Sequence, residues 1–263
     1  MKAIILAAGK GKRLLPITNE IPKSMIEFGE IPLLERMVNT FKNCGIKDIS
    51  IVVGHNANKI NFPNVQTFLN EKYDQTNMLE SLFCAEDKID DKVIISYADI
   101  IFEERILKKL ISSKEDITLV VDTEWLNYWK LRIDDPLDDA HETVTINNDG
   151  NIISIGQDVK NVNDVNGHFI GLMKVQKNGV KKLKELYHKS KFEAENGKNP
   201  LNPNLTFKNS RLVDLIQEII RKGIQVNMST TKNGWLEFDT LKDYKIYNDL
   251  KDRNMLNKII QLE

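Results

Sequence analysis

Short apolar runs alternate with amphipathic stretches along the first half of the chain. The apolar runs have the length of buried strands, and the stretches between them carry apolar residues at helical spacing. The predicted strands are Lys2–Leu6, Asp48–Val53, Lys92–Ser96 and Ile117–Val121, and the predicted helices are Pro32–Asn43, Met78–Glu86 and Glu103–Ser112. This alternation favours an α/β fold, in which helices cover both faces of a mostly parallel sheet.

The second half of the chain has a different pattern. An Asn-Asp-Gly turn joins two short runs and predicts a β-hairpin over Thr143–Ile155. Further strands are predicted at Phe169–Val175, Gln225–Met228 and Trp235–Phe238, and helices at Lys177–Glu195 and Arg211–Lys222. A terminal helix or helix pair is predicted over Leu241–Leu262. The polar segment Ala194–Thr206 is a candidate flap. Because no linker-like boundary interrupts these elements, we predict one domain over residues 1–263 whose second half caps the first.

The composition narrows the range of partners. Lysine and arginine number 37 and aspartate and glutamate 38, so the net charge is −1 and a broad nucleic-acid-binding surface is not expected. Cys44 and Cys84 lie far apart, which argues against a disulfide framework or a zinc site and fits a reducing cytoplasm. There is no signal-like start and no apolar run of membrane-spanning length. We therefore expect a cytoplasmic protein with no membrane partner.

Small and basic residues follow the first predicted strand. Small side chains here leave room for a ligand to approach the backbone, and they belong to Ala7, Ala8, Gly9 and Gly11. Positive charge gathers in the same region, at Lys10, Lys12, Arg13 and Lys23. The chain has no P-loop run, and Leu14 stands where a dinucleotide fingerprint needs a small residue. The pattern fits either an ordinary turn on a basic surface or a site for phosphate groups.

Carboxylates at two places are candidates for a cation site. Asp99 follows the third predicted strand inside an apolar string, where an unpaired carboxylate is costly. It is either a cap of the next helix or a ligand of Mg²⁺ at the carboxyl edge of the sheet. Glu237 and Asp239 are two residues apart in a predicted strand and so point to the same face. They belong either to a solvent-facing edge strand, with Asp239 as a helix cap, or to a cation site.

Several of these residues stand in longer motifs. Leu6-Ala7-Ala8-Gly9-x-Gly11-x-Arg13-Leu14, followed by Pro22-Lys23, resembles the signature of the nucleotidyltransferases that make sugar nucleotides and CDP-alcohols. Thr76-Asn77, Tyr97-Ala98-Asp99 and Trp235-x-Glu237-x-Asp239-Thr240 resemble the branch that activates phosphocholine, 2-aminoethylphosphonate or phosphoglutamine with CTP. The resemblance extends over residues 1–250. It implies a Rossmann-like, mostly parallel mixed sheet flanked by helices, similar to glycosyltransferase-A folds, with a β-hairpin and a helical cap.

The resemblance also implies a role for each matched position. Residues 1–122 would form the nucleotide-binding half of the domain, and residues 123–263 the acceptor-binding half with the C-terminal helices. Lys23, Arg13 and Asp99 would act in catalysis, and Asp99 and Asp239 would hold Mg²⁺ as the cofactor. The nucleotide would contact Leu6, Ala7, Ala8, Gly9, Gly11, Lys12, Arg13, Thr76, Asn77 and Ala98.

A charged, aromatic segment after the fourth predicted strand is expected to be a loop that meets the acceptor. The predicted acceptor-binding residues are Trp125, Tyr128, Arg132, Asp122, Glu124 and Glu237. The aromatic residues fit either packing or cation–π contact with a quaternary ammonium. Asp122 or Glu124 would suit an amine, and Arg132 would suit the acceptor's phosphate. Similar enzymes often read Asp-Ala-Glu downstream, whereas this chain has an inserted residue in Asp139-Ala140-His141-Glu142.

The function implied by the resemblance is a Mg²⁺-dependent cytidylyltransferase. It would transfer CMP from CTP to a small phosphorylated or phosphonate acceptor and release pyrophosphate, for the decoration of cell-surface or capsular polysaccharide. CTP and the acceptor are the expected partners, and a homodimer is left open. Two alternatives remain: a sugar-1-phosphate nucleotidyltransferase that uses UTP, GTP or dTTP, and a non-catalytic nucleotide-sensing module on the same fold.

Overall fold

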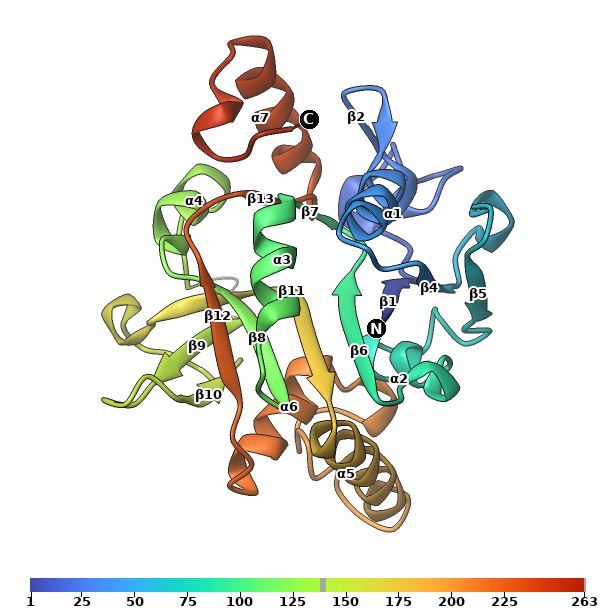
Figure 1. Cartoon of the computed structure of the whole chain (residues 1–263), viewed down its shortest axis with the longest axis vertical. Helices are drawn as coiled ribbons and strands as arrows, with labels where there is room; N and C mark the ends of the chain where they lie inside the picture. The colour runs from blue at the N-terminus through green and yellow to red at the C-terminus, as the bar shows by residue number, and fades with distance from the viewer. Residues whose placement is uncertain (138–140, 263) are drawn as a thin grey trace.

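The computed structural model describes residues 1–137 and 141–262, which fold around one large mixed sheet (Figure 1). One half of the sheet is parallel and consists of β1 (Lys2–Ala7), β4 (Asp48–Val53), β5 (Gln66–Leu69) and β6 (Lys92–Tyr97). Strand β1 lies between β4 and β6, and β5 extends the sheet beyond β4. Because parallel strands end at the same edge, the loops that follow β1 and β6 meet there.

The other half of the sheet is mixed. It consists of β8 (Ile117–Asp122), β9 (Thr143–Ile146), β10 (Ile152–Ile155), β11 (Gly167–Gln176) and β12 (Asn227–Thr231). Strand β11 joins the two halves, since it pairs antiparallel with β6, β8 and β9. Strand β10 continues from β9 in the predicted hairpin, and β12 pairs in parallel with β8.

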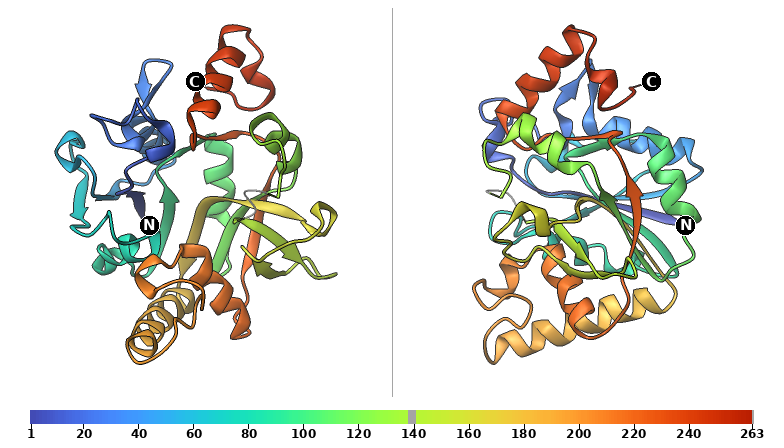
Figure 2. Two further views of the ribbon diagram at one scale, coloured as in Figure 1. Left: turned by 180° about the vertical axis from the view of Figure 1, so that it is seen from behind. Right: turned by 90° about the vertical axis from the view of Figure 1, so that its left-hand side faces the viewer.

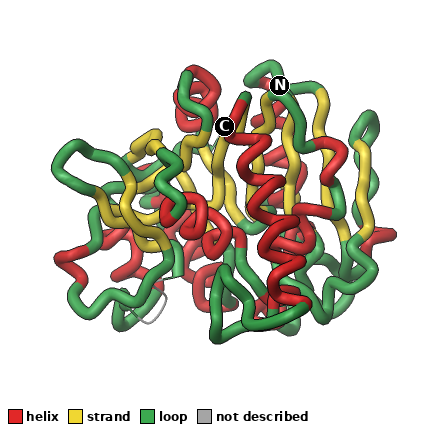
Figure 3. Tube along the Cα trace, turned by 90° about the horizontal axis from the view of Figure 1, so that it is seen from below, coloured by secondary structure: helices red, strands yellow, loops and turns green. Residues whose placement is uncertain are grey.

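Helices cover both faces of the sheet and form two hydrophobic cores (Figures 2 and 3). One core contains residues of α1 (Leu33–Asn43), α3 (Glu104–Ser112), α4 (Trp125–Arg132) and α7 (Leu241–Asp252). The other contains residues of α2 (Met78–Phe83), α5 (Asn178–Glu195) and α6 (Leu212–Arg221). Within β1, Ile5 points into the first core, whereas Ile4 and Leu6 point into the second. This alternation explains why β1 reads as a continuous apolar run.

Two small antiparallel pairs lie outside the main sheet. They are β2 (Glu27–Phe28) with β3 (Ile31–Pro32), and β7 (Ile100–Phe102) with β13 (Trp235–Glu237). The second pair matters for the site, because β7 follows Asp99 directly and β13 leads directly to Asp239. The backbone N–H of Phe238 donates a hydrogen bond to the carbonyl oxygen of Asp99 at 2.8 Å. Segments that are far apart in sequence are thereby fixed side by side.

The predicted α/β architecture, with its helices, strands and hairpin, is confirmed, and several local predictions are wrong. The segment after β8 is helix α4 rather than a loop. Strands β5 and β7 were not predicted, and β12 begins at Asn227 rather than Gln225. Helix α7 ends at Asp252, and a short 3₁₀ turn at Leu256–Lys258 follows it. Of the inserted Asp-Ala-His-Glu motif, Asp139 and Ala140 lie outside the described residues.

No helix within residues 1–137 and 141–262 combines the length and the apolar character that crossing a membrane requires.

Candidate active site

A cavity of about 410 Å³ opens at the edge of the sheet where β1 and β6 end. It is lined by Leu6, Ala7, Gly9, Lys10, Gly11, Lys12, Arg13, Lys23, Ser24, Tyr73, Asp74, Met78, Tyr97, Ala98, Asp99 and Asp239. The structure thus brings together the small-residue loop, the predicted catalytic residues and both predicted metal ligands. Another cavity of the same volume lies beside α1, α3 and Leu262, and it contains none of the predicted residues. The chemistry therefore singles out the cavity at the strand ends.

The loop after β1 is shaped by Gly11. Its φ of +64° is a left-handed conformation that favours glycine. A Cβ atom at this position would lie 2.8 Å from the Cβ of Lys23, so the loop and the Lys23 segment are in close contact. The hydroxyl of Thr18 donates a hydrogen bond to the carbonyl oxygen of Gly11 at 2.8 Å. Gly9, in contrast, has open space within 4 Å of the position of a Cβ, which leaves its backbone accessible from the cavity.

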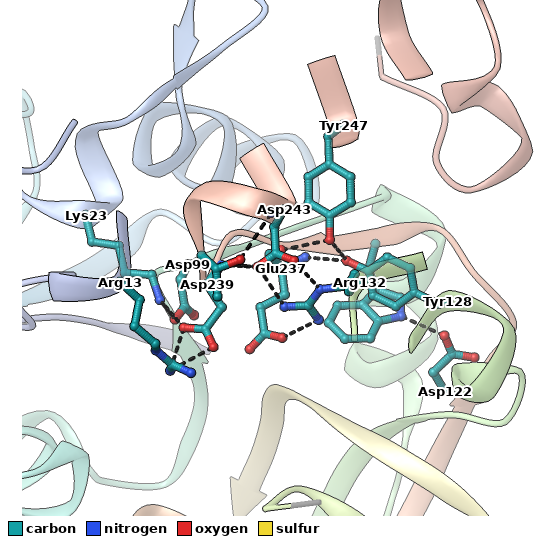
Figure 4. Close-up of polar contacts among 12 residues, drawn as sticks. Arg13, Lys23, Asp99, Asp122, Tyr128, Arg132, Glu237, Asp239, Asp243 and Tyr247 are labelled. Atoms are coloured by element: carbon teal, nitrogen blue, oxygen red, sulfur yellow. Dashed lines mark hydrogen bonds and ion pairs between the residues drawn. The ribbon is translucent and has the colours of Figure 1, made fainter. Parts of the chain in front are cut away.

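The ammonium of Lys23 reaches both Asp99 and Asp239 (Figure 4). Its Nζ is 2.7 Å from Oδ2 of Asp99 and 2.9 Å from Oδ1 of Asp239, and so bridges the two carboxylates. Arg13 contacts Oδ2 of Asp239 at 2.7 Å from the solvent side, with 64% of its side chain exposed. Burial disfavours the Lys23 ammonium, but Asp99 and Asp239 outweigh burial and raise its pKa. Lys23 is therefore a fixed positive charge inside the cavity.

These contacts exclude the capping alternative for both aspartates. The N-cap of α3 is Glu103, and Asp99 faces Lys23 instead. The N-cap of α7 is Thr240, whose side chain accepts a hydrogen bond from the backbone N–H of Asp243, and Asp239 again faces Lys23. Burial would raise the pKa of the Asp239 carboxyl, but Lys23 and Arg13 lower it further than burial raises it. Asp239 is therefore held in its anionic form.

The donor set of the two aspartates fits a divalent cation. Oδ1 of Asp99 is buried and has no hydrogen-bond partner among the described residues, and an orphaned carboxylate oxygen of this kind calls for a ligand. Mg²⁺ is usually bound by one or two carboxylates, with water and phosphate oxygens as its other ligands. No group of three or more His, Cys, Asp or Glu residues in the described part of the chain is arranged to hold a metal. The pair Asp99–Asp239 thus fits a Mg²⁺ site that a substrate completes, and does not form a closed protein site.

Arg132 does not face the cavity. Its side chain is 1% exposed and donates to both oxygens of Asp243, at 2.9 and 3.2 Å, and to Oε2 of Glu237 at 2.7 Å. Asp243 in turn accepts hydrogen bonds from the backbone N–H groups of Asp239 and Thr240. The prediction that Arg132 binds the acceptor's phosphate is therefore not supported by its position. The guanidinium supports the segment that carries Glu237 and Asp239.

The aromatic residues of α4 also pack inside the protein. Trp125 and Tyr128 are each 3% exposed, and Tyr128 contacts the ring of Trp235. The hydroxyl of Tyr128 accepts a hydrogen bond from the backbone N–H of Glu237 at 2.8 Å. These contacts favour packing over the predicted cation–π contact. Sequence reasoning misplaced them because the buried face of this short helix includes Arg132, while Leu131 on another side is exposed, so its apolar residues show no clear helical periodicity.

The carboxylates predicted for the acceptor lie in three different settings. Asp122 is fully buried, and its Oδ2 accepts a hydrogen bond from Nε1 of Trp235 at 2.7 Å, which makes it a structural anchor. Glu124 is on the surface and pairs with Lys232. Glu237 is 18% exposed and lies next to the charged cluster. Burial, together with Asp239 and Asp99, raises its pKa to about 7 even though Arg132 opposes the shift. Of these carboxylates, Glu237 alone lies close to Asp99 and Asp239, although it is not among the residues that line the cavity.

Thr76 and Asn77, which were predicted to contact the nucleotide, are not among the residues that line the cavity. Asn77 is the N-cap of α2, and its Oδ1 accepts a hydrogen bond from the backbone N–H of Met78 at 2.7 Å. The cavity is lined instead by neighbours of this pair, Tyr73, Asp74 and Met78. No sequence signal marked Tyr73 or Asp74, because they lie in the irregular connection between β5 and α2 and β5 itself was not predicted.

Comparison with known proteins places this geometry in a family. Residues 3–143 match the MobA-like NTP transferase domain. The chain belongs to this nucleotidyltransferase family. The match covers the loop after β1, Lys23 and Asp99, whereas Asp239 lies outside it.

Relatives of this nucleotidyltransferase include enzymes that use CTP. CTP:phosphoglutamine cytidylyltransferase of Campylobacter jejuni subsp. jejuni serotype O:2 is 33% identical over 257 residues, which cover 94% of this chain and 98% of that protein. Choline-phosphate cytidylyltransferase of Streptococcus pneumoniae is 32% identical over 135 residues, which cover 48% of this chain and 57% of that protein. The first relative extends the similarity through the segment that carries Glu237 and Asp239.

Solved structures confirm the fold of the nucleotidyltransferase. The CTP:phosphocholine cytidylyltransferase of Streptococcus pneumoniae superposes with a TM-score of 0.75 at 20% identity, over 95% of this chain and 98% of that one. The inositol-1-phosphate CTP transferase of T. maritima superposes with a TM-score of 0.67 at 20% identity, over 99% and 98% of the two chains. At this level of identity the likeness concerns the fold alone.

Proposed function

We propose that the protein is a cytidylyltransferase that transfers CMP from CTP to a small phosphorylated or phosphonate acceptor. The observation that carries this proposal is the cluster of Lys23, Arg13, Asp99 and Asp239 beside the glycine loop at the strand ends. The relative that aligns over 94% of the chain acts with CTP and phosphoglutamine, which supports CTP as the nucleotide. A cytoplasmic location, where CTP is made, and use of the product in surface or capsular polysaccharide belong to the same proposal.

The reaction follows from the charges in the cavity. An oxygen of the acceptor's phosphate attacks the α-phosphorus of CTP, the new P–O bond forms, and the bond to the β-phosphate oxygen breaks with release of pyrophosphate. The attacking oxygen is already anionic at neutral pH, so the step needs no general base. Catalysis then rests on positioning and on neutralising charge. Lys23 and Arg13 supply positive charge where the triphosphate enters.

The same proposal includes Mg²⁺ as cofactor. Asp99 and Asp239 are the residues that would hold it, in line with the orphaned oxygen of Asp99. When bound, Mg²⁺ would stabilise the negative charge of the triphosphate as a Lewis acid. The protein itself positions the nucleotide. The loop with Gly9 and Gly11 lets the backbone approach the nucleotide, and Arg13 reaches the phosphates from the solvent side.

Glu237 is the proposed contact for a cationic or polar part of the acceptor. Its carboxylate is held in place by Arg132 at 2.7 Å. It lies close to Asp99 and Asp239 of the charged cluster. Trp125 and Tyr128 are buried and so pack inside the protein. Glu237 is therefore the proposed contact for the cationic group that the aromatic residues were one candidate to bind.

A pyrophosphate-release screen tests the proposal. Purified protein with Mg²⁺ is given CTP, UTP, GTP, ATP or dTTP together with phosphocholine, 2-aminoethylphosphonate, phosphoglutamine or hexose-1-phosphates. We expect release with CTP and one small acceptor. Release with only UTP or dTTP and a sugar phosphate would replace the proposal with the sugar-nucleotide alternative. Nucleotide binding without Mg²⁺ dependence and without pyrophosphate release would indicate a sensing module.

A further inference from the structure

The position of Lys23 has a consequence for the order in which ligands bind. Its ammonium is 2.7 Å from Asp99 and 2.9 Å from Asp239, so it lies between the two carboxylates that the proposed function assigns to Mg²⁺. Arg13 covers the second oxygen of Asp239 at 2.7 Å. Of the four carboxylate oxygens of the pair, only Oδ1 of Asp99 has no partner among the described residues. A cation that binds the pair therefore has to compete with Lys23.

We propose that the Lys23 ammonium is a built-in counter-ion that keeps divalent cations off the Asp99–Asp239 pair until the phosphates of a nucleotide draw it away. The inference rests on the proposed function, because it takes Asp99 and Asp239 as the carboxylates that hold Mg²⁺. In the nucleotide-free protein, Lys23 and Arg13 together balance the charge of the pair, and Lys23 fixes its geometry. When a triphosphate enters, its anionic oxygens provide new partners for the ammonium, and the carboxylates become available.

The surroundings of Lys23 support this exchange. Its side chain is 16% exposed and those of Asp99 and Asp239 are 22% and 8% exposed, so the pair attracts cations more strongly than it would in water. The cavity also contains Lys12 and Arg13, which can meet the triphosphate first. A long, unbranched lysine side chain can move its charge by several ångströms while its backbone stays in place. Gly11 keeps the loop against the Cβ of Lys23, so the backbone end of the side chain is fixed.

The exchange links the two ligands thermodynamically. A nucleotide that removes Lys23 from the carboxylates raises their affinity for a divalent cation, and the bound cation raises the affinity for the nucleotide by the same factor. Free divalent cations alone would then bind poorly. The protein would take up metal and nucleotide together.

Equilibrium dialysis with Mn²⁺ tests the inference without any measurement of activity. Mn²⁺ and CTP pass through the membrane and reach the same free concentrations on both sides, so excess Mn²⁺ on the protein side is bound to protein. For the wild type we expect almost no excess without CTP and one Mn²⁺ per chain with CTP. For Lys23→Met we expect one Mn²⁺ per chain without CTP, at a free Mn²⁺ concentration at least tenfold lower than the wild type needs.

Lys10→Met is the matched control. It removes the same charge from the wall of the same cavity, and no ion pair is seen between Lys10 and either aspartate. Its binding of Mn²⁺ without CTP should stay close to that of the wild type. If the two variants gain affinity equally, general charge explains the effect and the inference is wrong.

Two further outcomes would also overturn it. One is a wild type that binds one Mn²⁺ per chain equally well with and without CTP. The other is a folded Lys23→Met variant that binds Mn²⁺ no better than the wild type. Should Lys23→Met fail to fold, the wild-type comparison with and without CTP decides alone. The pyrophosphate-release screen remains a separate measurement, so failure of the proposed reaction and failure of the counter-ion role can be told apart.

Discussion

Arg132 and Asp243, which are 111 residues apart in sequence, form a buried two-point ion pair directly behind the strand that carries Glu237 (Figure 4). Asp243 also accepts hydrogen bonds from the backbone N–H groups of Asp239 and Thr240, at 3.1 and 2.7 Å. The pair therefore fixes the backbone from which Asp239 reaches Lys23. The charged cluster in the cavity therefore depends on a second pair of charged residues, Arg132 and Asp243, which is buried.

Removal of Arg132 should destabilise the whole protein. Arg132→Met leaves Asp243 and Glu237 as buried carboxylates without their cation, which costs about 3–5 kcal/mol when a buried pair is broken from one side. Urea denaturation followed by circular dichroism measures this loss. Arg253→Met is the control, because it breaks a surface pair with Asp249 and should change the free energy of unfolding by less than about 1 kcal/mol. Equal effects of the two variants would show that the buried pair has no special role.

A milder variant separates support from direct binding of the acceptor. Arg132→Lys keeps the charge but loses the two-point geometry of the guanidinium. If Arg132 acts by supporting Asp239, Arg132→Lys should lower both the stability and kcat. The KM of the acceptor should then change little. A large rise in the acceptor's KM at unchanged stability would instead place Arg132 in contact with the acceptor's phosphate.

The predicted fold was right where a single periodicity decides the element. Strand β1 and helices α1 and α3 carry uniform or one-sided apolar patterns, and the structure confirms them. Strand β5 was missed because it lies at the edge of the sheet and its residues are mostly exposed. Helix α4 was missed because its buried face includes the charged residue Arg132 beside Trp125, Tyr128 and Trp129, whereas Leu131 is exposed, so burial does not follow the apolar pattern.

The candidate site also contains residues that the sequence predicted correctly and residues that it did not. Lys23, Asp99 and Asp239 were predicted from motifs, and the structure brings both aspartates within hydrogen-bond distance of Lys23. The local sequence around Arg132 could not show that its partners are Glu237 and Asp243. Residue type alone suggested a phosphate ligand, whereas burial makes the side chain a structural cation. Sequence motifs identify groups that meet a ligand, but the residues that hold them in place are defined by tertiary contacts.

The two aspartates that contact Lys23 should be essential for turnover but not for folding. Asp99→Asn and Asp239→Asn each remove one negative charge and keep the shape of the side chain. We expect kcat to fall by about 10²-fold or more, which corresponds to about 2.7 kcal/mol of lost transition-state stabilisation. Pyrophosphate release under saturating CTP measures the change, with far-ultraviolet circular dichroism as the check of folding. Glu124→Gln, on the surface, should keep wild-type turnover. Near-normal rates in either aspartate variant would remove that residue from the site.

Two glycines of the loop after β1 should respond in opposite ways to alanine. Gly11→Ala forces a Cβ into a left-handed conformation and to within 2.8 Å of the Cβ of Lys23. It should lower the free energy of unfolding by about 1–2 kcal/mol and reduce turnover, since Lys23 has to move. Gly9→Ala meets open space and has no left-handed φ, so its stability should stay within about 0.5 kcal/mol of the wild type. Thermal melts of both variants measure the difference, and a stable Gly11→Ala protein would contradict the close contact.

His168 should make stability depend on pH below neutrality. Its ring is buried against Trp129 and Trp235, and burial, followed by the charge of Arg132, lowers its pKa well below the ordinary value. The folded protein therefore keeps His168 neutral, while the unfolded chain takes up a proton below about pH 6.5. Above neutrality His168 is neutral in both the folded and the unfolded protein, so its contribution to the free energy of unfolding is at its maximum. It falls by up to about 1.4 kcal/mol per pH unit as the pH drops from 6.5 toward the folded-state pKa.

A comparison of variants isolates this contribution of His168. Glu237, whose pKa is raised to about 7, acts in the opposite direction, since the folded protein binds its proton more readily than the unfolded chain does. The measured quantity is therefore the difference in unfolding free energy between wild type and His168→Phe, taken from urea titrations between pH 7.5 and 5. We expect this difference to shift in favour of the phenylalanine variant by about 1 kcal/mol or more across that range. A constant difference for His168→Phe would mean that the buried ring accepts a proton in the folded protein.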